Sequence, residues 1–433
     1  MSNTHKLIRL SEHYREQDVS AYLGKVCPRI HFKTNTEPPF CIVCTGSEDT
    51  ERKLSSEYYV GTDWLKENEV AVYVEPKLNV EDSQVDILQM LVESMSNPDT
   101  SMYLHDMFEV KPDKPFITLP HNQDFITPLL MLHFLNVVKT IVRKGLKKSY
   151  YSVNENLHCK VKGKVLVAQT IKHNLVKNKQ LHTQCHYSEF GINGVENRLL
   201  KKALIFTQRY LDTLIGKEKK DNSFQVFLSN TFNYITPAFQ AVSPEVELDE
   251  VKHCKFNPFF KEYKDGLELA RLILKRYGYN INNVKKEEEV KVPPFWIDMT
   301  KLFELFVLAQ LKKRYKNEVE FQVTVPSGVL DYLILKKGEK MVVDAKYKPR
   351  WEKRNIVEDI RQVSGYARDT KITDKLGIEQ ENRGKEVPDC LIIYSKQLNG
   401  HKDLSVLNSL KEDALAEYVG FFRIGVALPE INA

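Results

Sequence analysis

The sequence lacks the motifs that bind nucleotides or supply a catalytic serine. No G-x-x-x-x-G-K-[ST] or G-x-G-x-x-G pattern occurs, and no G-x-S-x-G pattern. Loops of the first two kinds hold phosphates on backbone N–H groups, and the third kind is typical of serine hydrolases. We therefore expect that this chain itself binds no nucleotide.

Features of secreted and membrane-spanning proteins are also missing. Met1–Arg9 is polar and mixed in charge, unlike a secretory leader. The most apolar stretch, Pro128–Val142, contains His133, Asn136 and Lys139. It is shorter than the roughly 20 residues that a membrane span needs. We expect a buried helix there, no membrane partner and a cytoplasmic protein.

Cysteine is scarce, with seven residues scattered along 433 positions. An odd, scattered set fits free thiols in a reducing compartment. Cys41 and Cys44 form one C-x-x-C pair with Cys27 and His31 upstream, but no second tight ligand pair follows. We therefore expect small buried residues in a strand here rather than a zinc site.

The length and the charge pattern predict a multidomain α+β protein. A chain of 433 residues exceeds a single core, and the net charge of +5 permits a nucleic-acid partner without requiring one. The charged run Lys285–Lys291, closed by Pro293-Pro294, is the best domain boundary. We predict a β-rich domain over residues 1–115, a mainly helical middle region over 116–290, and an α/β domain with a mixed sheet over 291–433.

In the last domain, the spacing predicts a hairpin that brings two aspartates together. Strands are expected over Val323–Leu335 and Lys340–Tyr347, joined by a turn at Lys337-Gly338. This turn places Asp331 opposite Asp344, with facing Cβ atoms about 5 Å apart. A helix is expected before the hairpin over Asp298–Tyr315, capped by Asp298 or Thr300. After the hairpin, a helix is expected over Ile356–Arg368 and a strand over Cys390–Tyr394.

The hairpin carries a set of residues suited to phosphodiester hydrolysis. Asp344 and Lys346 lie on one face of a strand because side chains alternate. Two adjacent carboxylates repel unless a cation lies between them, and hard oxygen ligands suit Mg²⁺ or Mn²⁺. Asp331, Asp344 and Glu304 on the preceding helix are therefore the candidate metal ligands, and Lys346 is the candidate that orients or deprotonates the attacking water.

A simpler interpretation of the Asp-x-Lys triplet stays open. A solvated strand edge bearing Asp344 and Lys346 would explain the triplet alone, since such triplets are common. The literal Pro388-Asp389 pair is rejected as the site because no acidic residue stands two positions before Lys396. The combination of buried-looking Val342-Val343 with the aspartate at hairpin distance favours a PD-(D/E)xK nuclease.

Basic and aromatic residues follow the triplet and are candidates for DNA binding. Such stretches hold phosphates and stack on bases, although a solvated loop has the same composition. The candidate DNA-binding residues are Lys348, Arg350, Trp351, Lys353 and Arg354.

Across most of its length, the sequence resembles McrC, the nuclease subunit of McrBC-type modification-dependent restriction systems. The stretches that carry the resemblance include Tyr59-Val60-Gly61, Val74-Glu75-Pro76-Lys77, Lys162-Gly163-Lys164-Val165, Glu196-Asn197-Arg198-Leu199-Leu200 and Val343-Asp344-Ala345-Lys346-Tyr347. Gln362, with Asp359 and Tyr366 on the same expected helix, resembles the additional catalytic glutamine of the superfamily. Leu330 departs from the signature, which has proline before the first aspartate.

The resemblance implies a restriction-endonuclease-like domain that cuts double-stranded DNA in antiviral defence, typically DNA that contains modified cytosine such as 5-methylcytosine. It also implies a McrB-like AAA+ GTPase ring as the partner, contacted and stimulated by the amino-terminal part of the chain. Two alternatives stay open: a stand-alone DNA endonuclease or repair nuclease of the same fold, and a non-catalytic DNA-binding or ring-activating subunit.

Overall fold

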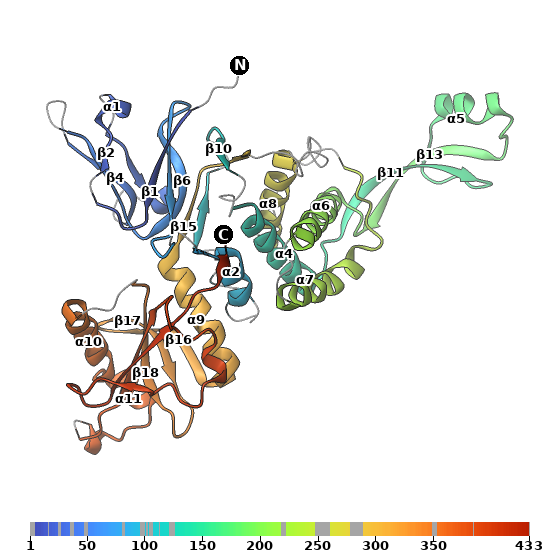
Figure 1. Cartoon of the computed structure of the whole chain (residues 1–433). Helices are drawn as coiled ribbons and strands as arrows, with labels where there is room; N and C mark the ends of the chain where they lie inside the picture. Colours follow the sequence, from blue (N-terminus) through green and yellow to red (C-terminus); the bar gives the residue numbers. More distant parts are fainter. Residues whose placement is uncertain are drawn as a thin grey trace. The chain divides into compact units, whose positions relative to one another are not determined.

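The computed structural model describes residues 5–15, 17–24, 27–34, 39–46, 51–79, 83–95, 100, 103, 107–111, 113–120, 126–217, 222–246, 260–277, 289–348, 353–383 and 385–432. The chain forms two compact units (Figure 1). The first unit combines residues 1–126 with 288–433, and the second comprises residues 127–287. The structure thus groups the first and last predicted domains in one unit, unlike the three-part division predicted from the sequence.

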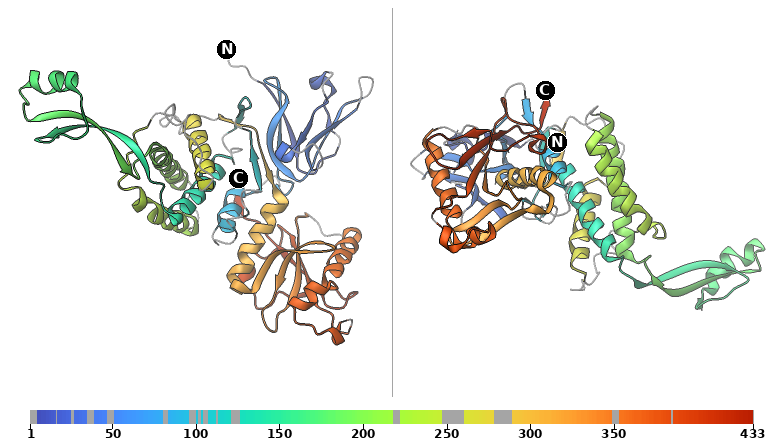
Figure 2. Two further views of the ribbon diagram at one scale, coloured as in Figure 1. Left: turned by 180° about the vertical axis from the view of Figure 1, so that it is seen from behind. Right: turned by 90° about the horizontal axis from the view of Figure 1, so that it is seen from below.

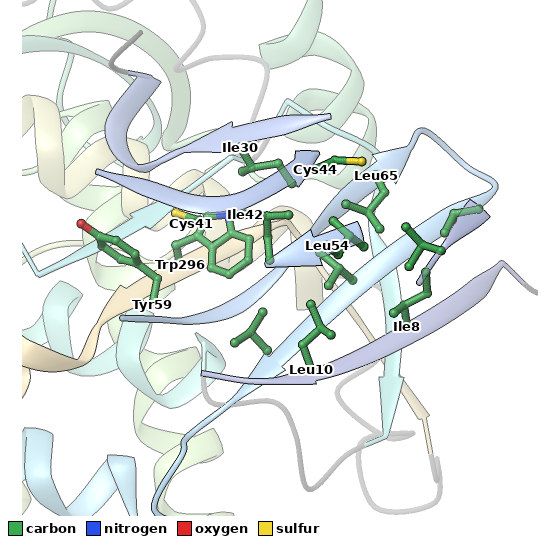
Figure 3. Close-up of a cluster of buried hydrophobic side chains, with 14 of the residues drawn as sticks. Ile8, Leu10, Ile30, Cys41, Ile42, Cys44, Leu54, Tyr59, Leu65 and Trp296 are labelled. Atoms are coloured by element: carbon green, nitrogen blue, oxygen red, sulfur yellow. The ribbon is translucent and has the colours of Figure 1, made fainter. Parts of the chain in front are cut away.

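Two sheets enclose the core of the amino-terminal part, as its β-branched and aromatic runs predict. One sheet has the order β1-β7-β6-β15-β9 and the other β2-β5-β4-β3, with the short helix α1 (Ser20–Leu23) beside them. The strands are β1 (Lys6–Ser11), β2 (Gln17–Asp18), β3 (Arg29–His31), β4 (Phe40–Thr45), β5 (Lys53–Ser56), β6 (Tyr59–Lys66), β7 (Val70–Glu75), β9 (Phe108–Val110) and β15 (Phe295–Asp298). Their inward side chains, among them Ile8, Ile42, Leu54 and Trp296, form one apolar cluster (Figure 3).

Strand β15 comes from the far end of the sequence and lies between β6 and β9. Its Trp296 is fully buried. Gly61 on β6 permits this pairing, because a Cβ there would lie 2.1 Å from the Phe295 carbonyl oxygen. The chain after residue 291 therefore completes the amino-terminal sheet before it forms a sheet of its own.

The carboxy-terminal part of this unit is a mixed six-stranded sheet with the order β16-β17-β18-β19-β21-β20. Strands β18, β19 and β21 run parallel, and the remaining pairs are antiparallel. The elements are α9 (Met299–Tyr315), β16 (Val319–Val325), β17 (Gly328–Ile334), β18 (Met341–Lys346), α10 (Lys353–Ala367), α11 (Thr370–Lys375), β19 (Asp389–Ser395), β20 (Asp413–Ala414) and β21 (Phe421–Val426).

The elements expected in this part form close to their predicted bounds, with one exception. Asp298 caps α9 and accepts a hydrogen bond from the Lys301 amide at 3.0 Å. The single strand expected over Val323–Leu335 is wrong. The chain turns back at residues 326–327, so that β16 pairs with β17. Pro326 explains the break, because proline cannot donate to a sheet ladder.

Two short antiparallel pairs and one helix complete the first unit. The strand β8 (Ser83–Val85) pairs with β22 (Glu430–Asn432), and β10 (Ile117–Pro120) pairs with β14 (Glu289–Val292). Helix α2 (Ile87–Met95) contacts α9. Strands from both ends of the sequence are therefore paired at three places in this unit.

The second unit has a helical base. Its helices are α4 (Ile126–Lys144), α5 (Val167–His173), α6 (Val195–Lys217), α7 (Asn222–Ile235) and α8 (Lys261–Tyr277). A Cβ at Gly266 of α8 would lie 3.1 Å from Ile141 and 3.4 Å from Leu200, so these three helices pack closely. Helix α4 is the one helix within the described ranges long and apolar enough to cross a membrane, but 61% of that stretch is buried inside the protein.

The middle region also contains a long β-ribbon that its expected helical character missed. Strands β11 (Ser149–His158) and β13 (His182–Gly191) pair antiparallel over ten residues each, and β12 (Lys164–Val165) pairs with β13. Figure 2 shows this ribbon extending from the helices, with α5 at its far end. Tyr150 and Phe190 on the ribbon are exposed. The description of residues 116–290 as mainly helical is therefore incomplete.

Candidate active site

The predicted hairpin forms in the predicted register. Strand β17 pairs with β18 so that Tyr332 faces Val343, and one step further along this register Asp331 lies opposite Asp344. The connecting turn includes Gly338, whose φ of 84° favours glycine. The Asp331 Oδ2 atom accepts a hydrogen bond of 2.8 Å from the Ala345 amide. The two carboxylates are thus held on adjacent strands by the backbone.

Lys346 connects the hairpin to helix α10. Its Nζ lies 2.8 Å from Asp344 Oδ2 and donates a hydrogen bond of 2.9 Å to Gln362 Oε1. Gln362 Nε2 in turn donates to the hydroxyl of Tyr366 at 3.1 Å. The structure therefore brings Gln362, which the family resemblance singled out, into direct contact with the lysine of the triplet.

A further pair of acids lies at the start of α9. Glu304 is partly buried, and its backbone carbonyl accepts a hydrogen bond of 2.7 Å from the Tyr332 hydroxyl on β17. Burial raises the pKa of Glu304 to about 7, and the charges of Asp298 and Asp344 add to this shift. Asp298 was expected only as a helix cap, but its charge also acts on Glu304. Burial raises its own pKa as well.

The site carries more negative charge than its lysine balances. Burial raises the pKa of Asp331 well above its ordinary value, and the charges of Asp344 and Glu304 raise it further. Burial also raises the pKa of Asp344, although Lys346 opposes that shift. For Lys346, burial favours the neutral form, but Asp344 and Asp331 outweigh it and raise the pKa. Such mutual repulsion is relieved when a cation binds.

The donor atoms fit a hard divalent cation held by few protein ligands. Asp344 is only 2% exposed, and its Oδ2 accepts no hydrogen bond of regular geometry although Lys346 lies beside it. Among the residues that the structure describes, no three His, Cys, Asp or Glu side chains gather into a complete ligand set. Mg²⁺ is commonly held by one or two carboxylates, with water and substrate phosphate supplying the other oxygens. Asp331 and Asp344 fit that arrangement, and Glu304 interacts with both through its charge.

The cysteines form no comparable site in the described part of the chain. Cys41 and Cys44 lie on β4 and are buried, while Cys27 is exposed. Burial raises the pKa of Cys41, and burial with a hydrogen bond to Cys27 raises the pKa of Cys44 to about 12. The expectation of small buried residues in a strand holds for Cys41 and Cys44.

The basic stretch after β18 is described only in part. Lys348 forms an ion pair with Asp359 on α10, with Nζ–Oδ1 at 2.8 Å. Arg350 and Trp351 lie outside the described residues, and Lys353 and Arg354 begin helix α10. Lys348 is therefore tied to the protein, and a role of these residues in DNA binding stays a prediction.

Sequence reasoning did not find the residues that lie behind the hairpin. Tyr347, directly after Lys346, is 3% exposed and donates a hydrogen bond of 3.1 Å to Glu12. Lys77 lies over the ring of Tyr347. Glu12 and Lys77 come from the amino-terminal sheet, hundreds of positions away, and no local pattern signals such a contact. The one available signal was that both Lys77 and Tyr347 stand in the stretches that carry the family resemblance.

Comparison with known proteins identifies one family. Residues 54–374 match the family described as McrBC 5-methylcytosine restriction system component. A search of curated proteins found no match. Two solved structures from Thermococcus gammatolerans are similar in part. A half-complex of McrB AAA+ hexamers with bound McrC shows 16% identity and a TM-score of 0.39, covering 97% of this chain and 94% of that chain. The McrBC complex shows 16% identity and a TM-score of 0.27, covering 71% and 87%.

Proposed function

Because the chain belongs to the McrBC family of restriction-system components, we propose that it is the DNA-cleaving subunit of such a system. The observation that carries this proposal is the arrangement of Asp331 and Asp344 on adjacent strands with Lys346 beside them. Opposed carboxylates and a lysine on a β-hairpin are the functional core of a PD-(D/E)xK nuclease. The mixed sheet, preceded by α9 with Glu304, supports the same fold.

In the proposed mechanism, Asp331 and Asp344 would hold Mg²⁺ or Mn²⁺ through their carboxylate oxygens. A bound ion of this kind lowers the pKa of water and neutralises charge on the scissile phosphate. Glu304 supplies a further negative charge near the start of α9. In the metal-free protein, burial and the charges of Asp298 and Asp344 raise its pKa to about 7.

Lys346 acts as a fixed positive charge in this proposal. The neighbouring aspartates raise its pKa, so its ammonium group is protonated at neutral pH. An ammonium aimed at the phosphate stabilises the negative charge that develops on its oxygens in the transition state. Gln362 accepts a hydrogen bond from Lys346 and donates one to Tyr366, which restricts where the ammonium can lie.

The partner in this proposal is a McrB-type AAA+ GTPase, and the substrate is double-stranded DNA with modified cytosine. The family is named for 5-methylcytosine restriction. This chain carries no nucleotide-binding glycine-rich motif. Any movement along DNA driven by GTP hydrolysis therefore requires a second protein. In this proposal, that protein also recognises the modified base.

The test compares substitutions at the hairpin with a matched aspartate elsewhere in the same sheet. Asp344→Asn and Lys346→Ala are expected to lower cleavage of 5-methylcytosine-containing plasmid at least about 100-fold. Asparagine is chosen because Asp344 is buried and a smaller residue would leave a cavity. Reactions contain Mg²⁺, GTP and a McrB-type partner, and thermal melting monitors folding.

Asp389→Asn is the control, because Asp389 begins β19 beside Met341, at the opposite end of β18 from Lys346, and its carboxylate pairs with Lys411. It removes the literal Pro-Asp pair and is expected to leave cleavage within about twofold of the unmodified protein. Normal cleavage by both Asp344→Asn and Lys346→Ala would refute the nuclease assignment.

A further inference from the structure

The side chain of Tyr347 is buried directly behind the candidate active site. Tyr347 follows Lys346 at the end of β18, so its side chain points to the opposite face of the strand. Its hydroxyl donates to Glu12 Oε2 at 3.1 Å, and its ring centroid lies 3.9 Å from Lys77 Nζ. Its ring also meets that of Phe303, the neighbour of Glu304 on α9, at 5.9 Å between centroids. Tyr347 therefore connects the end of β18, which carries Asp344, to α9, which carries Glu304.

Glu12 and Lys77 reach this position from the same edge of the amino-terminal sheet. Strands β1 and β7 run parallel, with Ser11 opposite Glu75, so their ends lie side by side. The Glu12 amide donates to the Glu75 carbonyl at 2.8 Å, which ties the two ends together. Both side chains then extend toward the end of β18.

The contacts of Lys77 include the backbone of the catalytic strand. Its Nζ donates to the Tyr347 carbonyl at 3.0 Å and to Glu12 Oε1 at 3.5 Å. Its backbone amide also donates to Glu12 Oε2 at 3.4 Å. One ammonium group thus holds the main chain at the residue that follows Lys346, while Glu12 holds the side chain of that residue.

The burial of Glu12 and Lys77 indicates that their ion pair contributes little to the stability of the fold. The side chains of Lys77 and Glu12 are 9% and 0% exposed. Burial raises the pKa of Glu12 and lowers the pKa of Lys77, so desolvation outweighs their mutual attraction. A buried ion pair of this kind is a poor stabiliser compared with apolar side chains of similar volume. Its directional contacts do, however, define one position for the strand end.

We propose that Glu12 and Lys77 are positioning residues, which hold Tyr347 and thereby set the position of Lys346 in the nuclease site. This inference rests on the proposed nuclease function. It means that the amino-terminal sheet contributes to the catalytic geometry through two side chains. A displacement of about 1 Å in a catalytic group is sufficient to lower a rate about 100-fold, so these distant contacts act on turnover rather than on DNA binding.

The test uses three substitutions in the full chain together with a McrB-type partner. Tyr347→Phe removes one hydroxyl and keeps the ring, Glu12→Gln removes the carboxylate charge, and Lys77→Met removes the ammonium at similar length. Each is expected to lower kcat for plasmid cleavage about tenfold or more, with KM for DNA within about twofold. Glu12→Gln combined with Tyr347→Phe is expected to be no worse than the poorer single variant, because the two residues share one hydrogen bond.

The matched control is Lys66→Met, which removes a lysine from an exposed ion pair with Glu69 in the same sheet. It is expected to leave kcat unchanged. If Lys77→Met does not fold, the double variant Glu12→Gln/Lys77→Met is measured in its place, because it removes both charges together. Hydrogen exchange of Met341–Lys348 is expected to rise in the three variants and not in the control.

The outcomes separate this inference from the function on which it rests. If both Asp344→Asn and Lys346→Ala cleave normally, the nuclease proposal fails, and the positioning role fails with it. If Asp344→Asn is inactive while Tyr347→Phe, Glu12→Gln and Lys77→Met keep a normal kcat, only the positioning role is overturned. A rise in KM at constant kcat would overturn it as well.

Discussion

Replacing Glu304 with glutamine is expected to stabilise the metal-free protein above neutral pH. Burial, Asp298 and Asp344 raise the pKa of this carboxyl from 4.5 to about 7. The folded state therefore binds the proton more tightly than the unfolded state does. The stability that this proton contributes is full below pH 4.5 and is lost as the pH rises to about 7.

The magnitude follows from that interval. Each unit of pH between 4.5 and about 7 lowers the free energy of unfolding of the unmodified protein by about 1.4 kcal/mol, which gives about 3 kcal/mol in all. The Glu304→Gln variant has no such loss. Glutamine has nearly the same shape and cannot ionise. Glu304→Gln is therefore expected to exceed the unmodified protein by about 3 kcal/mol at pH 8, and the difference is expected to shrink toward pH 5.

Urea denaturation from pH 5 to pH 8 in the presence of a chelator measures this difference directly. Glu318→Gln is the control, because Glu318 is exposed in the short 3-10 helix Lys316–Glu318 that follows α9. The control is expected to run parallel to the unmodified protein at every pH. Parallel curves for Glu304→Gln, or a lower stability at pH 8, would show that Glu304 does not carry the buried charge inferred here.

Two further predictions concern the metal and the partner. Mg²⁺ and Mn²⁺ are expected to support cleavage, and Zn²⁺ is not. Ca²⁺ is expected to bind without supporting cleavage, because it positions oxygen ligands loosely. Full activity in excess chelator would contradict a metal-dependent mechanism. The region before residue 115 is expected to stimulate GTP hydrolysis by a McrB-type partner, independently of cleavage. Asp344→Asn is then expected to stimulate GTP hydrolysis normally. Tyr14→Ala and Tyr22→Ala remove exposed aromatic rings of the region before residue 115 and are expected to lower the stimulation. GTP turnover equal to that of the unmodified protein with these two variants would argue against a role of this region.

The geometry at the hairpin was predictable because it depends on local rules. Alternation along a strand and a short turn at Lys337-Gly338 are sufficient to place Asp331 opposite Asp344. The cap at Asp298 follows equally local chemistry. The strand break at Pro326 was also readable in principle, since proline interrupts a ladder.

The parts that escaped prediction lack a local signal. The ribbon of β11 and β13 is exposed or half-buried along most of its length, so it shows little of the apolar alternation that marks a strand with one buried face. The place of β15 beside β6, and the contact of Tyr347 with Glu12, depend on residues that are far apart in sequence. Pairings of this kind are set by the tertiary structure and leave no periodic pattern in either segment.

The insertion of β15 into the amino-terminal sheet has a consequence for the order of events during synthesis. Trp296 Nε1 donates to Asp63 across 233 positions, and β22 pairs with β8 from an even greater separation. At about 5–20 residues per second, β6 waits roughly 10–50 s on the ribosome before its neighbour β15 is made. The unit of residues 127–287 is complete before that moment. A translation product that stops before β15 therefore lacks both the finished amino-terminal sheet and the hairpin with its acids.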